Sequence, residues 1–309
     1  MPLAVASRAT ALTLLALATL ASVGLTSPRV AAQEAETEGD WPDGKWQVAF
    51  DAIGATVHVP VPVRRPTATG STVTIEDAKI GARSFSLGAS YGITESFRVG
   101  VQLPWTSSSI EVAGFSRTTS SFGNLEVDGW YERALGELAA VTFGLGLAGG
   151  GQGKSSSTSQ TDADRSASNH AASGAHGRSF DARYESGRSS VVPSIELDWF
   201  RNGVQLEPYL RAQLLHDVTG EAPNPNVVTT ETGARVAYRW WGVLDTGLRA
   251  WWFAIPVGNE GTRSSIALEP ELRARVGHFT PLLGVIVPVY GPLTSPRVVA
   301  GELGVSVDF

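Results

Sequence analysis

The side chains most often used for metal binding and acid–base chemistry are sparse in this 309-residue chain, which has five histidines and no cysteine. No two histidines have the spacing that places two metal ligands on one face of a helix. His170 and His176 share a Ser/Gly-rich stretch with Asp162 and Asp164, where weak metal binding is the alternative to a solvated polar loop. The chain has no His-x-Ser pair of the kind that an outer-membrane phospholipase carries on one strand face. We therefore expect no catalytic residue and no metal site, and keep an enzyme as a remote alternative.

The composition excludes further chemistries. Without cysteine the chain has no disulfide, no thiolate zinc ligand and no cysteine nucleophile. The glycines between 144 and 151 are not followed by a helix pattern that begins with Lys-Ser/Thr, so they do not form a phosphate-binding loop. A formal net charge of −6 without a basic cluster argues against nucleic acid as a partner. We expect no cofactor.

The charged residues follow a single pattern, because they occupy every second position of segments whose other positions are largely apolar. Side chains at alternate positions of a strand point to the same face of its sheet. Opposite charges on neighbouring strands can pair on that face, so we expect a charged network there. The residues with this pattern are Arg98, Glu126, Asp128, Glu196, Asp198, Glu207, Arg211, Arg235, Arg239, Arg249, Glu269, Glu271, Arg273 and Arg275.

The segments that carry these charges alternate with a period of two, which is typical of strands with one apolar face. No segment of comparable length has the 3.6-residue period of a helix. The alternation predicts about twelve strands, at 45–59, 79–93, 97–106, 122–133, 138–150, 188–201, 204–216, 229–241, 244–256, 264–277, 280–290 and 297–309.

The lengths of the connections alternate as well. Short links of two to four residues are expected at 94–96, 134–137, 202–203, 242–243 and 278–279. Longer links are expected at 60–78, 107–121, 151–187, 217–228, 257–263 and 291–296. This order indicates antiparallel hairpins with short periplasmic turns and longer extracellular loops. We therefore expect an all-β fold, a single up-and-down transmembrane barrel of about twelve strands, with a water-soluble β-sandwich as the alternative.

The apolar face of the expected strands identifies the side that contacts lipid. It carries aromatic residues close to the strand ends, and rings of tyrosine and tryptophan prefer the boundary between lipid and water. An arginine facing the middle of the bilayer would cost about 2–4 kcal/mol, so the fourteen charged residues are expected to face the lumen. The expected border aromatics are Trp46, Trp105, Tyr131, Trp199, Trp240 and Trp252.

The first 32 residues predict a signal peptide that is removed on export. A weakly basic start precedes an uncharged apolar run at 9–25, and Val30-Ala31-Ala32 supplies small residues for cleavage. A membrane anchor is the alternative, but the run is short for a spanning helix. Residues 33–44 then form a short acidic periplasmic lead-in to a barrel at 45–309. The polar segment at 151–187 is expected to be disordered outside the cell or folded back over the barrel mouth.

The end of the chain predicts an assembly signal. Leu303, Val305, Val307 and Phe309 alternate up to the last residue, so the closing strand ends in an aromatic side chain. Such an ending resembles the signal by which bacterial outer-membrane barrels engage the barrel-assembly machinery. We expect that machinery and outer-membrane lipid as partners.

Residues 91–105 and 122–133, followed by Phe143-Gly144-Leu145-Gly146-Leu147, resemble one known family. They are similar to the outer-membrane barrels of the phenol-degradation meta-pathway type, often called transporters, and the resemblance covers about 85–150. It implies an outer-membrane barrel for hydrophobic or aromatic compounds, whereas the charged lumen favours polar solutes. We expect a passive channel for small solutes, with a structural barrel of blocked lumen as the alternative.

Overall fold

The computed structural model describes residues 44–67, 70–149, 171, 173–177, 188–218, 225–258, 264–291, 294 and 298–309. The expected signal peptide, almost all of the lead-in and most of the 151–187 segment lie outside these residues. The strands are β1 (Trp46–Thr67), β2 (Gly70–Thr94), β3 (Phe97–Val112), β4 (Phe115–Phe122), β5 (Leu125–Ala134), β6 (Ala139–Gly149), β7 (Arg188–Arg201), β8 (Val204–Asp217), β9 (Asn226–Trp240), β10 (Leu244–Val257), β11 (Ser264–Ala274), β12 (Phe279–Tyr290) and β13 (Ala300–Asp308).

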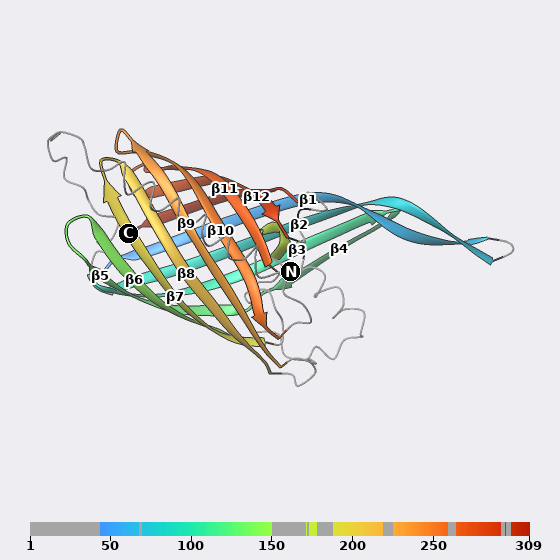
Figure 1. Ribbon diagram of the computed structural model, residues 1–309, viewed down its shortest axis with the longest axis horizontal. Helices are drawn as coiled ribbons and strands as arrows, with labels where there is room; N and C mark the ends of the chain where they lie inside the picture. The colour runs from blue at the N-terminus through green and yellow to red at the C-terminus, as the bar shows by residue number, and fades with distance from the viewer. Residues whose placement is uncertain are drawn as a thin grey trace, which may run out of the picture. The chain divides into compact units, whose positions relative to one another are not determined.

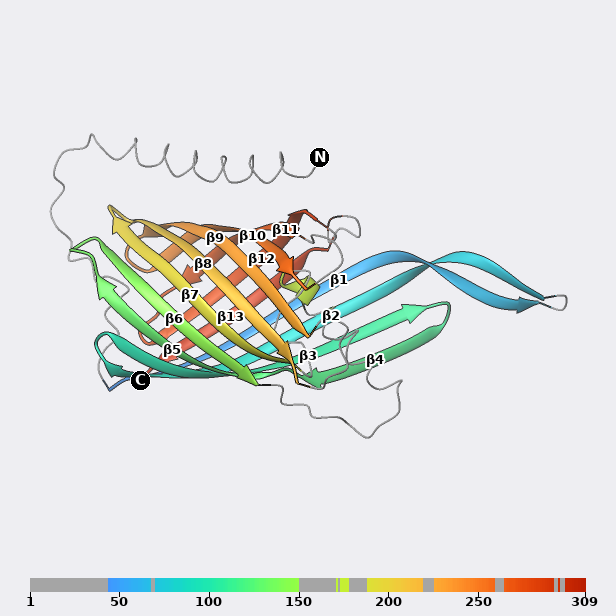
Figure 2. The same ribbon diagram turned by 60° about the horizontal axis from the view of Figure 1, so that its bottom comes forward.

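The strands form one closed antiparallel barrel (Figures 1 and 2). Each strand from β6 to β12 pairs with both of its neighbours in the sequence, and β13 pairs with β1 to close the sheet. Residues 97–102 of β3 pair with β5, and residues 105–112 of β3 pair with β4. Strands β4 and β5 therefore act as one strand interrupted at 123–124, and the barrel has twelve strands. This confirms the predicted fold class.

The five short connections gather at one end of the barrel, which we call the turn end; the opposite end is the loop end. Two-residue hairpins with a type I′ turn need left-handed backbone at both central positions. Asn202 and Gly203 supply it with φ of 53° and 79°, in the turn between β7 and β8. The chain also closes at this end, where the amide of Phe309 donates to the carbonyl oxygen of Trp46 at 2.8 Å.

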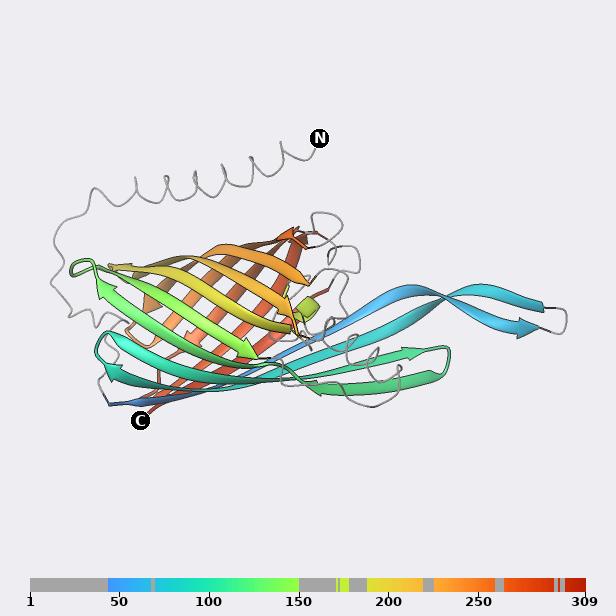
Figure 3. The ribbon, with the colours of Figure 1, turned by 90° about the horizontal axis from the view of Figure 1, so that it is seen from below.

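Two of the expected loops are in fact strands. The β1–β2 hairpin continues to the pair Thr67–Gly70, and the β3–β4 hairpin continues to Val112–Phe115. Figure 3 shows both hairpins extending beyond the barrel at the loop end. The prediction of loops at 60–78 and 107–121 was therefore wrong. Proline normally argues against a strand, and the part of β1 that had been expected to be a loop contains three prolines.

These three prolines do not disrupt the β1–β2 ladder, because they share one parity. The backbone groups of Trp46 bond to Phe309, so even-numbered residues of β1 direct their backbone groups toward β13 rather than β2. Pro60, Pro62 and Pro66 are all even-numbered and lie beyond the last residue that pairs with β13. Their missing N–H groups therefore lie at a free strand edge. We call the part of the hairpin beyond Ala55 the arm.

The outer face of the barrel is apolar. Leucines at outward positions of six strands are each about half exposed: Leu87, Leu145, Leu210, Leu248, Leu283 and Leu303. Among the expected border aromatics, Trp46, Trp105, Tyr131 and Trp240 are exposed, and Trp199 and Trp252 are partly buried. An apolar band with aromatic residues at its borders is the surface that a bilayer requires. Separately, the described residues include no helix long and apolar enough to cross a membrane.

Candidate functional site: the barrel interior

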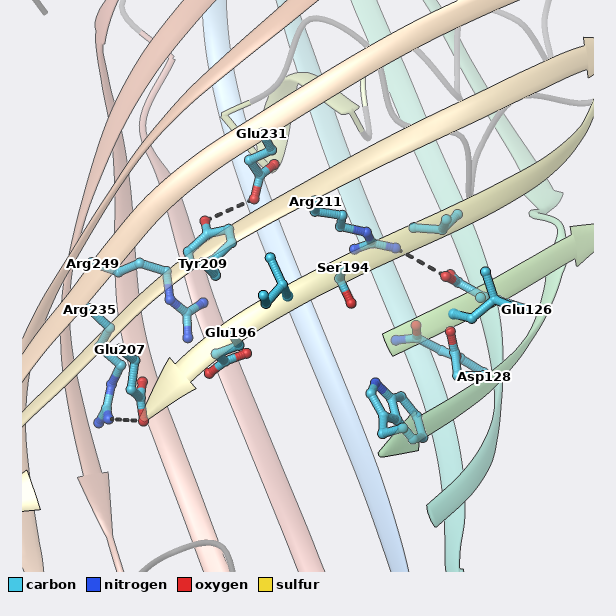
Figure 4. A pocket seen from close by; sticks show the side chains of 16 residues that line it. Glu126, Asp128, Ser194, Glu196, Glu207, Tyr209, Arg211, Glu231, Arg235 and Arg249 are labelled. Carbon is cyan, nitrogen blue, oxygen red and sulfur yellow. Dashed lines mark hydrogen bonds and ion pairs between the residues drawn. The ribbon is translucent and has the colours of Figure 1, made fainter. Parts of the chain in front are cut away.

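The fourteen charged residues expected in the lumen have the inward parity of their strands, and seven of them form ion pairs with one another. Arg235, on β9, lies at the centre of the network and is only 1% exposed. Its Nη1 lies 3.2 Å from Glu207 Oε1, a pair drawn in Figure 4, and its Nε donates to Glu271 Oε1. The same Nη1 donates to Gln205 at 3.0 Å. One buried guanidinium thereby joins strands β8, β9 and β11.

A second ion pair crosses the lumen rather than following the wall. Arg211 Nη2, on β8, lies 3.0 Å from Glu126 Oε1, on β5. Strands β6 and β7 lie between these two strands in the sheet, so the side chains meet inside the barrel. Arg249, on β10, lies 3.5 Å from Glu269 and 3.8 Å from Glu271 on the adjacent strand. These contacts link β5 with β8 and β10 with β11 through charged side chains.

A third group of charges lies near the turn end. Asp245 accepts from Arg239 at 3.0 Å and from Arg275 at 3.3 Å. Arg98 donates to Gln47, which donates in turn to Asp308 beside the barrel closure. Of the other expected lumen residues, Asp128 and Glu196 line a cavity, and Asp198 and Arg273 share the inward parity of their neighbours.

Sequence reasoning missed several inward carboxylates. Glu231 accepts a hydrogen bond from Tyr209 at 2.9 Å, and Asp51 accepts one from Ser86. Asp51 also lines a cavity together with Glu302 of β13. Each of these residues occupies the same alternate parity as the expected set, so a complete parity count along every strand would have found them. Their omission understated the negative charge of the lumen.

The side chains leave two adjoining cavities in the middle of the barrel. The larger, about 310 Å³, is lined by Glu126, Asp128, Glu196 and Glu207 among others (Figure 4). The smaller, about 190 Å³, is lined by residues that include Asp51, Glu269 and Glu302. Three residues, Tyr209, Arg211 and Arg249, line both cavities, so the two adjoin. Together they form a polar space enclosed by the strands.

Toward the loop end the inner face becomes apolar. The inward residues of β10 change from Asp245 and Arg249 to Trp251, Phe253 and Ile255, and the last three are almost fully buried. They form a cluster with inward residues of other strands, which are Ile53, Ala82, Leu215, Val227, Ala267, Ile286 and Ala300. The sequence did not predict this cluster, because 250–255 is apolar at every position and lacks alternation.

The described part of the long polar segment, 171 and 173–177, packs against this cluster. It includes one helical turn, and Ala175 is 1% exposed among the apolar side chains. His176 Nε2 lies 2.8 Å from Ser84 Oγ, and Ser265 Oγ donates to the Gly177 carbonyl oxygen at 3.2 Å. Figure 2 shows this short yellow-green turn between strands at the loop end. We call these residues the inner segment.

The metal alternative for this segment gains no support from the described residues. Their His, Asp and Glu side chains contain no group of three arranged to hold a metal ion. His176 instead contacts a serine hydroxyl of β2. His170, Asp162 and Asp164 lie outside the described residues.

The sequence and the structure were compared with those of known proteins. No family model and no curated protein matches the sequence. Among solved structures, an outer-membrane channel from Pseudomonas putida F1 matches with a TM-score of 0.58 and 10% identity, covering 91% of this chain and 100% of that one. The chain has the fold of an outer-membrane β-barrel.

Other solved barrels are similar at lower scores. The β domain of the Bordetella autotransporter BrkA matches with a TM-score of 0.47 and 13% identity, covering 86% of this chain and 100% of that one. The KdgM porin matches with a TM-score of 0.45 and 10% identity, covering 84% of this chain and 99% of that one.

Proposed function

We propose that the chain is an integral outer-membrane protein that acts as a passive channel for small polar solutes. The observation that carries the proposal is the pair of adjoining polar cavities inside a twelve-stranded wall. Barrels of eight strands are filled by their side chains, and barrels of sixteen or more hold an aqueous channel. Twelve strands with an incompletely filled, charged interior correspond to a narrow path. The fourteen lumen residues are proposed to line it.

The outer surface and the chain termini support the location. The apolar outer face suits lipid, and the signal peptide predicted at 1–32 would export the chain. We propose that Leu303, Val305, Val307 and Phe309 engage the barrel-assembly machinery. We also propose that the resemblance over 85–150 reflects kinship with the meta-pathway barrels, with polar rather than aromatic solutes. No part of the proposal requires a catalytic group.

A sealed structural barrel is the second candidate, and the inner segment is the observation that favours it. That segment fills part of the loop end, and the Arg211–Glu126 ion pair joins two strands that are not neighbours in the sheet. A channel requires that ions and small solutes pass between these groups. A sealed barrel requires that they do not.

Single-channel recording of the refolded full chain in planar bilayers separates the two candidates. We expect discrete conductance steps that change in the Arg211→Gln variant, because Arg211 lines both cavities. Arg201→Gln is the matched control, since Arg201 is exposed at the β7–β8 turn. Silence across many verified insertions would overturn the channel and support the sealed barrel. Steps that both variants leave unchanged would place the current outside these cavities.

A further inference from the structure

The inner segment places a titratable side chain at the boundary between the apolar cluster and the polar part of the lumen. His176 directly follows Ala175, which is buried in the apolar cluster, and the His176 side chain lines the smaller cavity. Histidine is the side chain whose ordinary pKa places its change of charge between pH 5 and 8. The charge at this boundary can therefore change near neutral pH while the barrel wall stays as it is.

Hydrogen bonds to β2 and β11 hold the inner segment against the wall. His176 Nε2 lies 2.8 Å from Ser84 Oγ, and Ser265 Oγ donates to the Gly177 carbonyl oxygen at 3.2 Å. A serine hydroxyl can donate or accept, so the contact between His176 and Ser84 is possible for both the neutral and the charged ring. Any preference for one form of the ring must then come from the charges that face it.

The charged groups that line the smaller cavity with His176 come from five strands of the described wall. With Tyr209 as a further titratable group, they are Asp51, Arg211, Arg249, Glu269 and Glu302. Arg211 already lies 3.0 Å from Glu126, so its positive charge is balanced from the other side of the lumen. The remaining groups decide the charge that the ring meets.

These remaining groups make the surroundings of the ring negative. Arg249 lies 3.5 Å from Glu269, so these two charges balance as well. Glu302 shares a hydrogen bond with Glu269, which places one proton between the two carboxyl groups. Asp51 adds a further negative charge from β1. With Glu126 included, three negative charges face two positive ones.

His176 can become charged without moving a charge into the apolar cluster. Its ring is partly exposed, whereas Ser173, Ala175 and Gly177 of the same segment are buried. A charge in apolar surroundings is costly, but the ring borders a polar cavity with a negative balance, which favours the protonated form. A group that binds its proton more tightly in one conformation stabilises that conformation as the pH falls, and this stabilisation is lost as the pH rises.

From this arrangement we infer that His176 is a pH-dependent latch for the inner segment. Protonation of the ring holds the segment more tightly against the lumen wall, and deprotonation loosens it. The inference goes beyond the proposed function, because it concerns the position of the segment whether or not a solute passes through the lumen. It makes the cover of the apolar cluster firm at acid pH and loose at alkaline pH.

The test uses the absence of cysteine from the chain, because a single introduced thiol then reports on one position. Ser173→Cys places a thiol in the inner segment at a position that is 1% exposed. Ser116→Cys, at an exposed position of β4, gives the labelling rate of an accessible thiol. The refolded full chain in detergent is labelled with a water-soluble maleimide at pH 5.5 and at pH 8. The protection is the rate at 116 divided by the rate at 173, which corrects for the pH dependence of thiol reactivity.

We expect the protection to be several-fold larger at pH 5.5 than at pH 8. His176→Gln keeps a hydrogen-bonding side chain that does not titrate, so the protection in this background should not depend on pH. His216→Gln is the matched control and should keep the parent's response, because His216 is exposed and contacts Asn226 of the wall. Asp51→Asn should reduce the response, and provides the test if His176→Gln does not refold.

Protection that is independent of pH, smaller at pH 5.5, or equally dependent on pH in the His176→Gln background would overturn the latch. Conductance is recorded separately at the same two pH values, so the failure of each proposal is distinguishable. Protection that depends on pH without conductance would retain the latch and reject the channel. Conductance with protection that is independent of pH would retain the channel and reject the latch.

Discussion

The two halves of the barrel interior are built in different ways. Toward the turn end the inner face is charged, and Arg235 contacts Gln205, Glu207 and Glu271 of the barrel wall. Toward the loop end the inner face is apolar, and the inner segment covers part of it. Both halves are lined by the same strands, and the change occurs on β10 between Arg249 and Trp251. The inward positions of one strand are therefore charged in one half of the barrel and apolar in the other.

The difference between the two halves indicates which half of the interior determines stability and which half can rearrange. Charges buried in the wall must keep their partners, because separating them leaves an uncompensated charge. An apolar patch must be covered to avoid contact with water, but the cover is held by packing and a few hydrogen bonds. Hydrogen bonds join the inner segment to Ser84 and Ser265 of the barrel wall. We therefore expect the charged half to determine stability and the apolar half to determine access.

The largest effect is expected for Arg235→Met in the charged half. The substitution removes the guanidinium group that contacts both Glu207 and Glu271, and removing one member of a buried pair costs about 3–5 kcal/mol. Chemical unfolding of the refolded barrel in detergent measures the free energy of unfolding. Arg201→Met, at an exposed position on the same barrel, is the control and should change it little. Equal losses in the two variants would mean that the network does not determine stability.

A smaller effect on stability, but a large effect on conductance, is expected for Gly177→Val. Gly177 has φ of +68°, and a Cβ there would lie 3.0 Å from Trp251, Ala267 and Ile286. The inner segment should leave its site at a cost of about 1–3 kcal/mol, because valine is strained in this backbone conformation. Planar-bilayer recording should then give steps several-fold larger than those of the parent chain.

The control for this prediction is Gly114→Val. Gly114, in the β3–β4 turn, has φ of +78° and no atom within 4 Å of a Cβ. It therefore reproduces the backbone strain without the steric contact, and its conductance should equal that of the parent chain. An unchanged conductance in Gly177→Val would mean that the inner segment does not limit access.

The smallest effect on stability is expected for Phe309→Ala. The side chain is 69% exposed, and exposed substitutions usually change stability by no more than about 0.5 kcal/mol. The backbone hydrogen bonds with Trp46 are retained. Unfolding in detergent should be nearly unchanged, whereas the amount in the outer membrane of cells should fall sharply. Phe279→Ala, an exposed aromatic at the same end, should leave both unchanged. Normal abundance of Phe309→Ala would reject the assembly signal.

Much of the fold follows from the sequence because a barrel wall repeats one rule. Each residue pair along a strand places one side chain in lipid and one in the lumen, so alternation identified the strands and the inward parity of Arg211 and Arg235. The rule fails where both faces have the same chemistry. At 250–255 both faces are apolar, and the inward Trp251 was indistinguishable from the outward Trp252. The partners of Arg211 also could not be predicted, because its contact with Glu126 skips two strands.

The arm fails the rule for a different reason, and its prolines have a consequence for contacts with other chains. A free strand edge offers a row of N–H and C=O groups to which a strand of another molecule can add. Pro60, Pro62 and Pro66 remove three donors from that edge of β1. Glu76 and Asp77 of β2 contact Arg65 and His58 of β1, so these side chains join the two strands of the arm. A strand that approaches this edge of β1 would meet missing donors, so the prolines disfavour the addition of another strand there.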